Sequence, residues 1–223
     1  MGLFAEIASL HNENVRKGLT GGLYRAPMSV DPVDIPDLFN TNGSIKAPLP
    51  EGYEPFGLIT DDGAQWSRST DQNDVTAWQT NDPARSDLTK DVGTLKVTGI
   101  ETNRVTIETF LGVDLSAPTL INGALRIGKP ALPPSKYWRM LALAVDTIGD
   151  AEFVIARMFP RAKVTAWDDQ AWNKTTSINW GTTFTSYLDS TLGESQVDFF
   201  GGSAFAPIAT AMGFNLAPAG GGA

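Results

Sequence analysis

The sequence predicts a mainly β protein with one short helix, and three features carry this prediction. A polar, threonine-rich segment over residues 84–99 alternates well enough to form a long strand with one exposed face. Two apolar runs, 137–145 and 152–159, flank a Thr-Ile-Gly-Asp turn and predict a hairpin through the core. Only residues 103–111 carry convincing helix signals, so we expect this helix to cover one face of a sheet.

Bulk properties exclude several classes of function. The 223-residue chain has a net charge of -8, so it repels nucleic-acid phosphates and is not built to wrap or read DNA. It has no cysteine and a single histidine, His11, which removes thiolate sites and histidine clusters. We therefore expect no metal, no cofactor and no enzymatic activity. We also expect no membrane span and no signal peptide, and synthesis in the cytoplasm of the producing cell.

The N-terminal quarter is expected to form an arm. Residues 2–16 have an irregular apolar face that suggests a short helix, and glycines and prolines interrupt residues 17–55. A simple linker would not carry many apolar side chains, so an arm that lies on a neighbouring subunit is favoured over a flexible leader. The apolar residues in question are Leu23, Tyr24, Met28, Val30, Ile35, Leu38 and Phe39.

The β body begins with a strand predicted over residues 56–60, which ends in an Asp-Asp-Gly turn. Residues 67–77 are almost wholly polar and predict a long loop or an exposed hairpin. The strand over residues 84–99 follows. The irregular spacing of its apolar residues predicts a β-bulge near Gly93.

The helix over residues 103–111 has signals at both ends. Thr102 or Asn103 can cap its first turn, and Gly112 can end it in the left-handed conformation. Short strands then alternate with turns such as Asn122-Gly123. The strands are expected at 123–129, 137–145, 152–159, 162–168, 175–187 and 195–200.

These elements divide the chain into three parts. Residues 1–52 form the expected arm, 53–200 the β domain, and 201–223 a flexible tail rich in small residues.

Two acidic pairs and a group of tryptophans are the only candidates for chemistry. Asp61-Asp62 and Asp168-Asp169 occupy turns, whereas a glycosidase needs two carboxylates that face one sugar. Trp167, Trp172 and Trp180 lie among polar residues, which leaves open a carbohydrate-binding β-sandwich. Packing in a core or at an oligomer interface is favoured for these rings.

A series of motifs between Ile59 and Gly112 has a distinctive order. The series is Thr60-Asp61-Asp62-Gly63, Val75-Thr76-Ala77-Trp78-Gln79, Asp82-Pro83-Ala84-Arg85, the threonine-rich strand, and Ile100-Glu101-Thr102-Asn103 leading to Phe110-Leu111-Gly112. In this order the segment resembles the major tail proteins of long-tailed bacteriophages. The runs Phe159-Pro160-Arg161-Ala162-Lys163-Val164 and Tyr187-Leu188-Asp189 are similar too.

The resemblance implies a β-sandwich or barrel-type tail tube fold with one short α-helix packed on the outside. It further implies that six subunits form a ring, that their long strands close an inner barrel, and that stacked rings conduct DNA into the host. The residues are compatible with this, because a strand with one polar face can close a ring without leaving a free edge. An acidic protein would also not adhere to passing DNA.

Three sets of residues are candidates for roles in such a tube. Polar side chains of the long strand are expected to line the lumen, while the polar segment and the arm are expected to touch the next ring. The lumen candidates are Arg85, Asp87, Lys90, Asp91 and Lys96; the inter-ring candidates are Arg68, Asp71, Asp74, Leu23, Tyr24 and Phe39; the core anchors are Trp78, Phe110 and Leu111.

The partners implied are further copies of the chain and other tail proteins, such as the tape measure and the tail terminator. DNA would pass without specific binding, and the protein would reside in the virion tail after synthesis in the cytoplasm of a bacterial host. Two alternatives stay open: the carbohydrate-binding module, and a tube component of a contractile secretion system.

Overall fold

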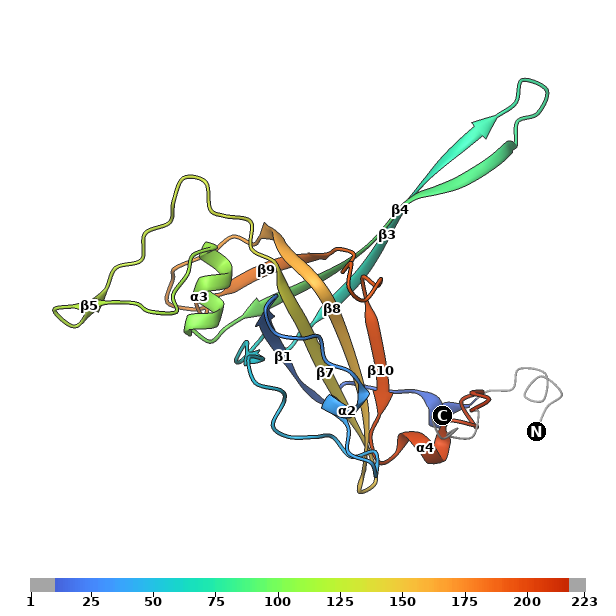
Figure 1. Cartoon of the computed structure of the whole chain (residues 1–223), viewed down its shortest axis with the longest axis horizontal. Helices are drawn as coiled ribbons and strands as arrows, with labels where there is room; N and C mark the ends of the chain where they lie inside the picture. The colour runs from blue at the N-terminus through green and yellow to red at the C-terminus, as the bar shows by residue number, and fades with distance from the viewer. Residues whose placement is uncertain (1–10, 217–223) are drawn as a thin grey trace.

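The structure, a computed structural model, describes residues 11–216 and consists mainly of antiparallel strands (Figure 1). The expected mainly β, sandwich-type fold is confirmed. The strands are β1 Thr20–Pro27, β2 Glu54–Pro55, β3 Gln65–Thr76, β4 Pro83–Gly99, β5 Leu120–Ile121, β6 Ala124–Leu125, β7 Trp138–Ile148, β8 Ala151–Trp167, β9 Trp180–Ser186 and β10 Val197–Gly201. The helices are η1 Asn12–Asn14, α2 Ile35–Leu38, α3 Arg104–Leu111 and α4 Phe205–Ile208.

The main sheet has the strand order β2-β1-β7-β8-β9-β4-β3, and β10 also pairs with β8. β8 is long enough to hold two partners in succession on one edge, β10 beside residues 154–158 and β9 beside residues 162–167. β7 occupies the other edge of β8 and ends at Trp138, opposite Ala162. Residues 163–167 of β8 therefore extend beyond the end of β7.

Strand β7 is buried on both faces, which explains its continuous apolar sequence. Met140 and Ala142 pack into one apolar cluster, and Leu141 and Leu143 pack into a second cluster on the opposite side of the sheet. The predicted hairpin is confirmed, since β7 pairs with β8 throughout its length. The first cluster also contains Leu95, Val97, Phe159 and Phe184, and the second contains Val33, Leu38, Phe39, Tyr53 and Phe199.

Helix α3 confirms its predicted position and both of its predicted ends. The side chain of Asn103 accepts a hydrogen bond of 2.9 Å from the backbone N–H of Thr106, whose hydroxyl accepts one of 3.1 Å in return. Gly112 ends the helix with φ of 67°, the left-handed conformation that favours glycine. Val105 of the helix packs into the first cluster, so α3 covers that face of the sheet.

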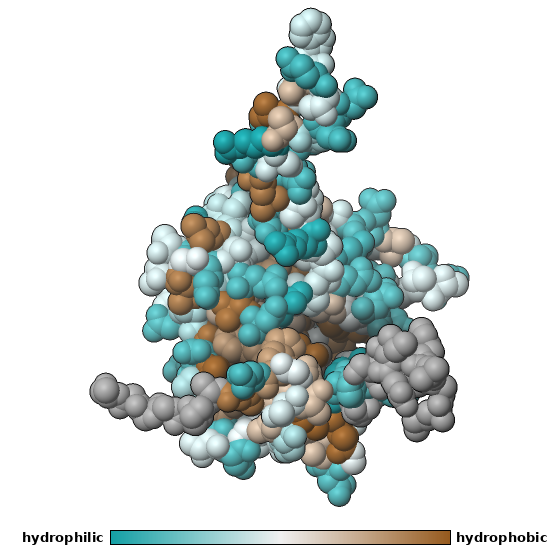
Figure 2. Space-filling view, turned by 90° about the vertical axis from the view of Figure 1, so that its right-hand side faces the viewer, coloured by the Kyte–Doolittle hydropathy of each residue, from teal (hydrophilic) through white to brown (hydrophobic). Residues whose placement is uncertain are grey.

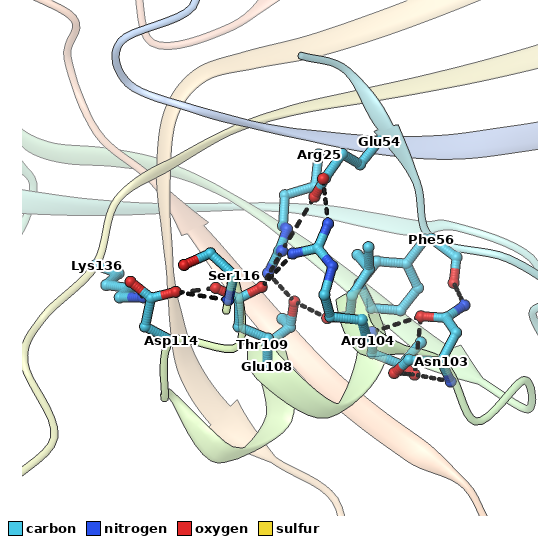
Figure 3. A network of polar contacts seen from close by, with 12 residues as sticks. Arg25, Glu54, Phe56, Asn103, Arg104, Glu108, Thr109, Asp114, Ser116 and Lys136 are labelled. Carbon is cyan, nitrogen blue, oxygen red and sulfur yellow. Dashed lines mark hydrogen bonds and ion pairs between the residues drawn. The ribbon is translucent and has the colours of Figure 1, made fainter. Parts of the chain in front are cut away.

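A buried ionic network joins α3 to β1 (Figure 3). Arg25 of β1, with a side chain only 1% exposed, donates a hydrogen bond of 2.7 Å to Glu108 and another of 2.7 Å to the hydroxyl of Thr109. Glu108 is 5% exposed and also pairs with Arg104 at 3.1 Å and with Lys136 at 3.5 Å. The helix is therefore held to the sheet by charge as well as by apolar packing.

Strands β3 and β4 form a hairpin that extends far from the body (Figure 1). Residues 67–77 are exposed as expected, but they form neither a loop nor a hairpin of their own: residues 67–76 belong to one strand, β3, which pairs with β4. The bulge expected near Gly93 is wrong: the register shifts between Asp71 and Gln72 instead, which leaves Thr89 as the extra residue. Gly93 has a different role, because a Cβ there would lie 2.9 Å from the ring of Phe159.

The expected arm is wrong for residues 20–27, which form β1 inside the main sheet. Glycines 21 and 22 do not break this strand: a Cβ on Gly21 would lie 2.3 Å from the carbonyl oxygen of Leu143, so glycine permits the close pairing with β7. The helix expected at 2–16 lies largely outside the described residues, which contain only η1 there.

The remaining strand boundaries are partly as expected. The Asn122-Gly123 turn is confirmed, with φ of 53° and 75°, between the short strands β5 and β6. The two strands expected at 152–159 and 162–168 are a single strand, β8, with a register shift beside Pro160. The strand expected at 56–60 is replaced by an isolated bridge between Ile59 and Gly99.

A second buried pair fixes the chain after β9. Arg139 donates a hydrogen bond of 2.9 Å to Asp189, which also accepts from the backbone N–H groups of Thr191 and Leu192. Burial alone would raise the pKa of Asp189, but these hydrogen bonds and the charge of Arg139 together hold that pKa below its ordinary value.

This lowered pKa predicts how stability depends on pH. The contribution of Asp189 is present above its ordinary pKa of 3.8 and is lost as the pH falls through the lower, folded-state pKa. We expect Asp189→Asn to show a smaller loss of stability than the wild type between about pH 4 and pH 2. Urea unfolding at several pH values measures this, and an equal loss in both proteins would contradict it.

Candidate assembly surfaces

One side of the sheet is polar where β8, β9, β4 and β3 lie next to one another. Thr94 of β4 lies opposite both Ser67 of β3 and Thr185 of β9, so the three side chains share one side. Their hydroxyls bond across the strands, at 2.6 Å between Ser67 and Thr94 and at 2.7 Å between Thr165 and Thr185. We call this surface the polar face; it consists of Gln65, Ser67, Thr94, Lys96, Lys163, Thr165, Thr183 and Thr185.

The polar side of the sheet carries three ion pairs, two of them on the hairpin and one, Lys96–Asp168, on the body. Register and alternation place four of the five lumen candidates on this side, namely Arg85, Asp87, Lys90 and Lys96. Each basic group has an acidic partner: the shortest N–O distance is 2.7 Å from Arg85 to Asp87, 3.3 Å from Lys90 to Asp71, and 3.0 Å from Lys96 to Asp168.

The fifth lumen candidate, Asp91, points to the opposite side of the hairpin. There it accepts two hydrogen bonds from Arg68, of 2.6 and 2.5 Å. These bonds favour the carboxylate and hold the pKa of Asp91 below its ordinary value. Arg68 and Asp91 therefore stabilise the hairpin on the side that faces away from the polar face.

The four-stranded region that carries the polar face has two free edges. β3 is the last strand of the sheet, and its outer edge has no partner strand within the described chain. At the other end, residues 163–167 of β8 lie beyond the end of β7. Unpaired edges of this length offer backbone N–H and C=O groups to another chain.

The outer part of the hairpin projects away from the body (Figure 1). All residues from Ser69 to Thr76 are exposed, and an isolated two-stranded hairpin is marginally stable in water. It nevertheless carries apolar side chains at its surface, and brown atoms are visible on the projecting part of the molecule in Figure 2. Val75, Trp78 and Leu88 are exposed by 51%, 99% and 56%. Such a segment is typical of a surface that is covered in an assembly.

The sequence pattern of a phage tail tube protein family matches residues 8–200. This chain belongs to that family. The match covers the whole sheet except the last residue of β10, together with the hairpin and α3. No curated protein was found to match the chain. The tail tube protein is thus a structural component of the phage virion tail, and membership of the family implies assembly with other tail components as a multimer.

Two of the three core anchors expected in this tail tube protein lie at the packing surface of α3. Phe110 is half-buried and meets Trp180 edge to face, with ring centroids 5.4 Å apart, and Leu111 is half-buried beside it. Trp78 as a core anchor is wrong. Its ring is 99% exposed at the tip of the hairpin, because the two flanking strands carry it away from the body.

Three of the six inter-ring candidates are exposed, and the other three are buried or partly buried. Arg68, Asp71 and Asp74 lie exposed on the hairpin. Leu23 and Phe39 are wrong as surface contacts, since they are 2% and 9% exposed and belong to the two apolar clusters; Tyr24 is partly buried against the second cluster.

The alternative chemistries find little support in the geometry. Asp62, Asp168 and Asp169 line one shallow cleft of about 300 Å³ with Lys96, which pairs with Asp168. Residues 11–216 contain no group of three or more acidic or histidine side chains arranged to hold a metal. Trp167 and Trp172 are exposed by 52% and 79%, but Trp180 packs on α3, so the three rings form no common stacking platform.

No helix among the described residues is long and apolar enough to cross a membrane.

Sequence reasoning missed several residues of these surfaces. Thr183 and Thr185 alternate with buried Thr182 and Phe184, and this alternation was a usable signal within the predicted strand 175–187. Lys163 and Thr165 could not be assigned a side, because the bulge between Val164 and Ala166 changes the alternation of β8.

Proposed function

We propose that this tail tube protein assembles into hexameric rings, that the rings stack, and that the polar face lines the channel through which DNA leaves the virion. One observation carries the proposal. The region of β8, β9, β4 and β3 combines a polar, hydroxyl-rich face with two free edges and an apolar core on its other side.

Ring closure follows from the two edges. The free edge of β3 in one copy pairs with the free edge of β8 in the next, so that each copy contributes four strands to a closed barrel. Six copies give a barrel of about 24 strands, larger than the 16–18-stranded barrels that already enclose an aqueous channel. Closure leaves no strand edge in the lumen unpaired.

The lining is suited to passage without binding. Each phosphate contact made by a free lysine or arginine would retain DNA, since it releases counterions. On the polar face, Arg85, Lys90 and Lys96 are instead paired with carboxylates, and Lys163 lies over the rings of Tyr137 and Tyr187. The net charge of -8 adds a general repulsion.

The hairpin beyond Ser69 makes the contacts between rings, with Asp71 and Asp74 among its exposed groups and Arg68 at its base. Tape measure and tail terminator proteins meet the tube inside and at its end, and the subunit is made in the cytoplasm of the bacterial host before it enters the virion.

Negative-stain electron microscopy over a concentration series tests the proposal. We expect rings or hollow tubes with a central channel, first appearing as the concentration rises. Uniform monomers at every concentration, together with binding to a glycan array, would contradict it and support the carbohydrate-binding alternative.

A further inference from the structure

An apolar pocket opens between α3, the segment 129–136 and the end of β8. Its volume is about 280 Å³. It lies beside the free edge of β8, where the sheet has no further strand to cover it. Its apolar lining includes Phe110, Leu111, Pro133, Trp138, Val164 and Trp167.

A matching side chain stands at the tip of the hairpin. Trp78 follows Ala77 in a turn closed by a backbone hydrogen bond of 3.4 Å from Thr80 to Ala77, and its ring touches almost nothing in its own chain. Exposing a whole indole is unfavourable, because an aromatic side chain buries about 150–250 Å² when it packs. The structure gives no reason within one copy for tryptophan at this position.

We propose that Trp78 of one copy inserts into this pocket of a second copy. The inference rests on the proposed tube and names its contact between rings. The fit in size is adequate, since a cavity of about 150 Å³ already admits benzene and this pocket is larger. Residues 69–76 pair only with β4 and therefore extend beyond the body. At about 3.4 Å per residue they span about 27 Å, which is enough to reach a neighbouring subunit.

Charge complementarity supports the same partner. The tip, residues 73–87, contains the acidic residues Asp74, Asp82 and Asp87 and one basic residue, Arg85. Two lysines, 129 and 136, stand on the pocket's side of the sheet; Lys136 already lies 3.5 Å from Glu108 and 3.9 Å from Asp114, whereas Lys129 has no ion pair among the described residues. The acidic tip therefore meets Lys129 at the edge of an apolar floor, an arrangement that favours one orientation of docking.

Disulfide trapping tests the contact directly, because the chain has no cysteine of its own. Gln79→Cys places a thiol beside Trp78, and Ser135→Cys places one at the rim of the pocket. When the two single variants are mixed, assembled and oxidised, we expect a linked pair that contains one copy of each. Thr147→Cys, exposed at the far end of β7, is the control partner and should give no linked pair with Gln79→Cys.

Two tryptophan substitutions provide the second readout. Trp78→Ala should raise the concentration required for assembly at least tenfold and leave the melting temperature unchanged, because the ring is 99% exposed. Trp172→Ala is the matched control, since it removes another exposed ring, 79% accessible, that belongs neither to the hairpin nor to the lining of the pocket. It should leave assembly unchanged.

The outcomes separate this inference from the proposed function. Tubes that form with no link between the Gln79→Cys and Ser135→Cys variants, or with an equal link to the Thr147→Cys control, would overturn the pocket contact and leave the tube intact. Normal assembly of Trp78→Ala would do the same. Absence of tubes from the wild-type protein under all conditions would overturn the proposed function and this contact with it.

Discussion

Replacing Glu108 with alanine is expected to lower the free energy of unfolding by about 3–5 kcal/mol, as happens when one partner of a buried ion pair is removed. The reason is the position of Arg25, whose side chain is 1% exposed and whose charge would lose its buried carboxylate. Thr109 would still accept a hydrogen bond from Arg25, and the partly exposed Glu54, 3.4 Å away, would compensate its charge only in part. Urea or thermal unfolding measures the loss, and a fall in melting temperature of about 6 °C or more is expected for a chain of this size.

The double variant Arg25→Met with Glu108→Leu is the control. It removes both buried charges and retains apolar volume, so most of the lost stability should return. Glu108→Ala with unchanged stability would contradict the buried network as a main attachment of α3. If the double variant remained as unstable as Glu108→Ala, the loss of stability would come from altered packing and not from an unpaired charge.

Removing the outer hairpin is expected to abolish assembly without unfolding the body. Ser69 and Val92 are directly opposed, so residues 70–91 can be replaced by Asn-Gly, which closes a two-residue hairpin. None of the removed residues is buried. We therefore expect a melting temperature close to that of the wild type and no tubes at concentrations where the wild type forms them, measured by light scattering and electron microscopy.

The control retains the hairpin and changes only its exposed charge. Asp74→Asn keeps the strand and its length, and should lower assembly far less than the deletion. Tubes of normal length from the shortened chain would contradict a role for the hairpin between rings. A shortened chain that is unfolded would show instead that the hairpin supports the body.

Local signals predicted much of the fold because they act over a few residues. Asn103 and Gly112 define α3 through hydrogen bonds and a backbone conformation that depend on residue type alone. The apolar runs of β7 and β8 required burial on both faces, and the sheet provides it. The strand β1 was missed because its glycines read as breakers, whereas they permit close pairing with β7, a strand over one hundred residues away in sequence.

The candidate lumen residues show why the side of the sheet that each residue occupies could not be predicted from the sequence. Arg85 and Asp87 share a side with Lys90 only because Thr89 is an extra residue in the register with β3. No feature of the sequence around Thr89 marks a bulge, so the side occupied by Asp91 could not be assigned. Trp78 was predicted to be a core residue because tryptophan side chains are highly buried on average. Its ring is exposed because the hairpin is long enough to carry it away from the body, and the sequence around Trp78 does not show that length.

A reconstruction of the assembled tubes by electron cryomicroscopy tests the proposed function most directly. We expect six copies in each ring, β3 of one copy paired with β8 of the next, and Thr94, Lys96, Thr183 and Thr185 facing the central channel. A tube in which these four side chains face outward, or lie buried between rings, would contradict the proposal.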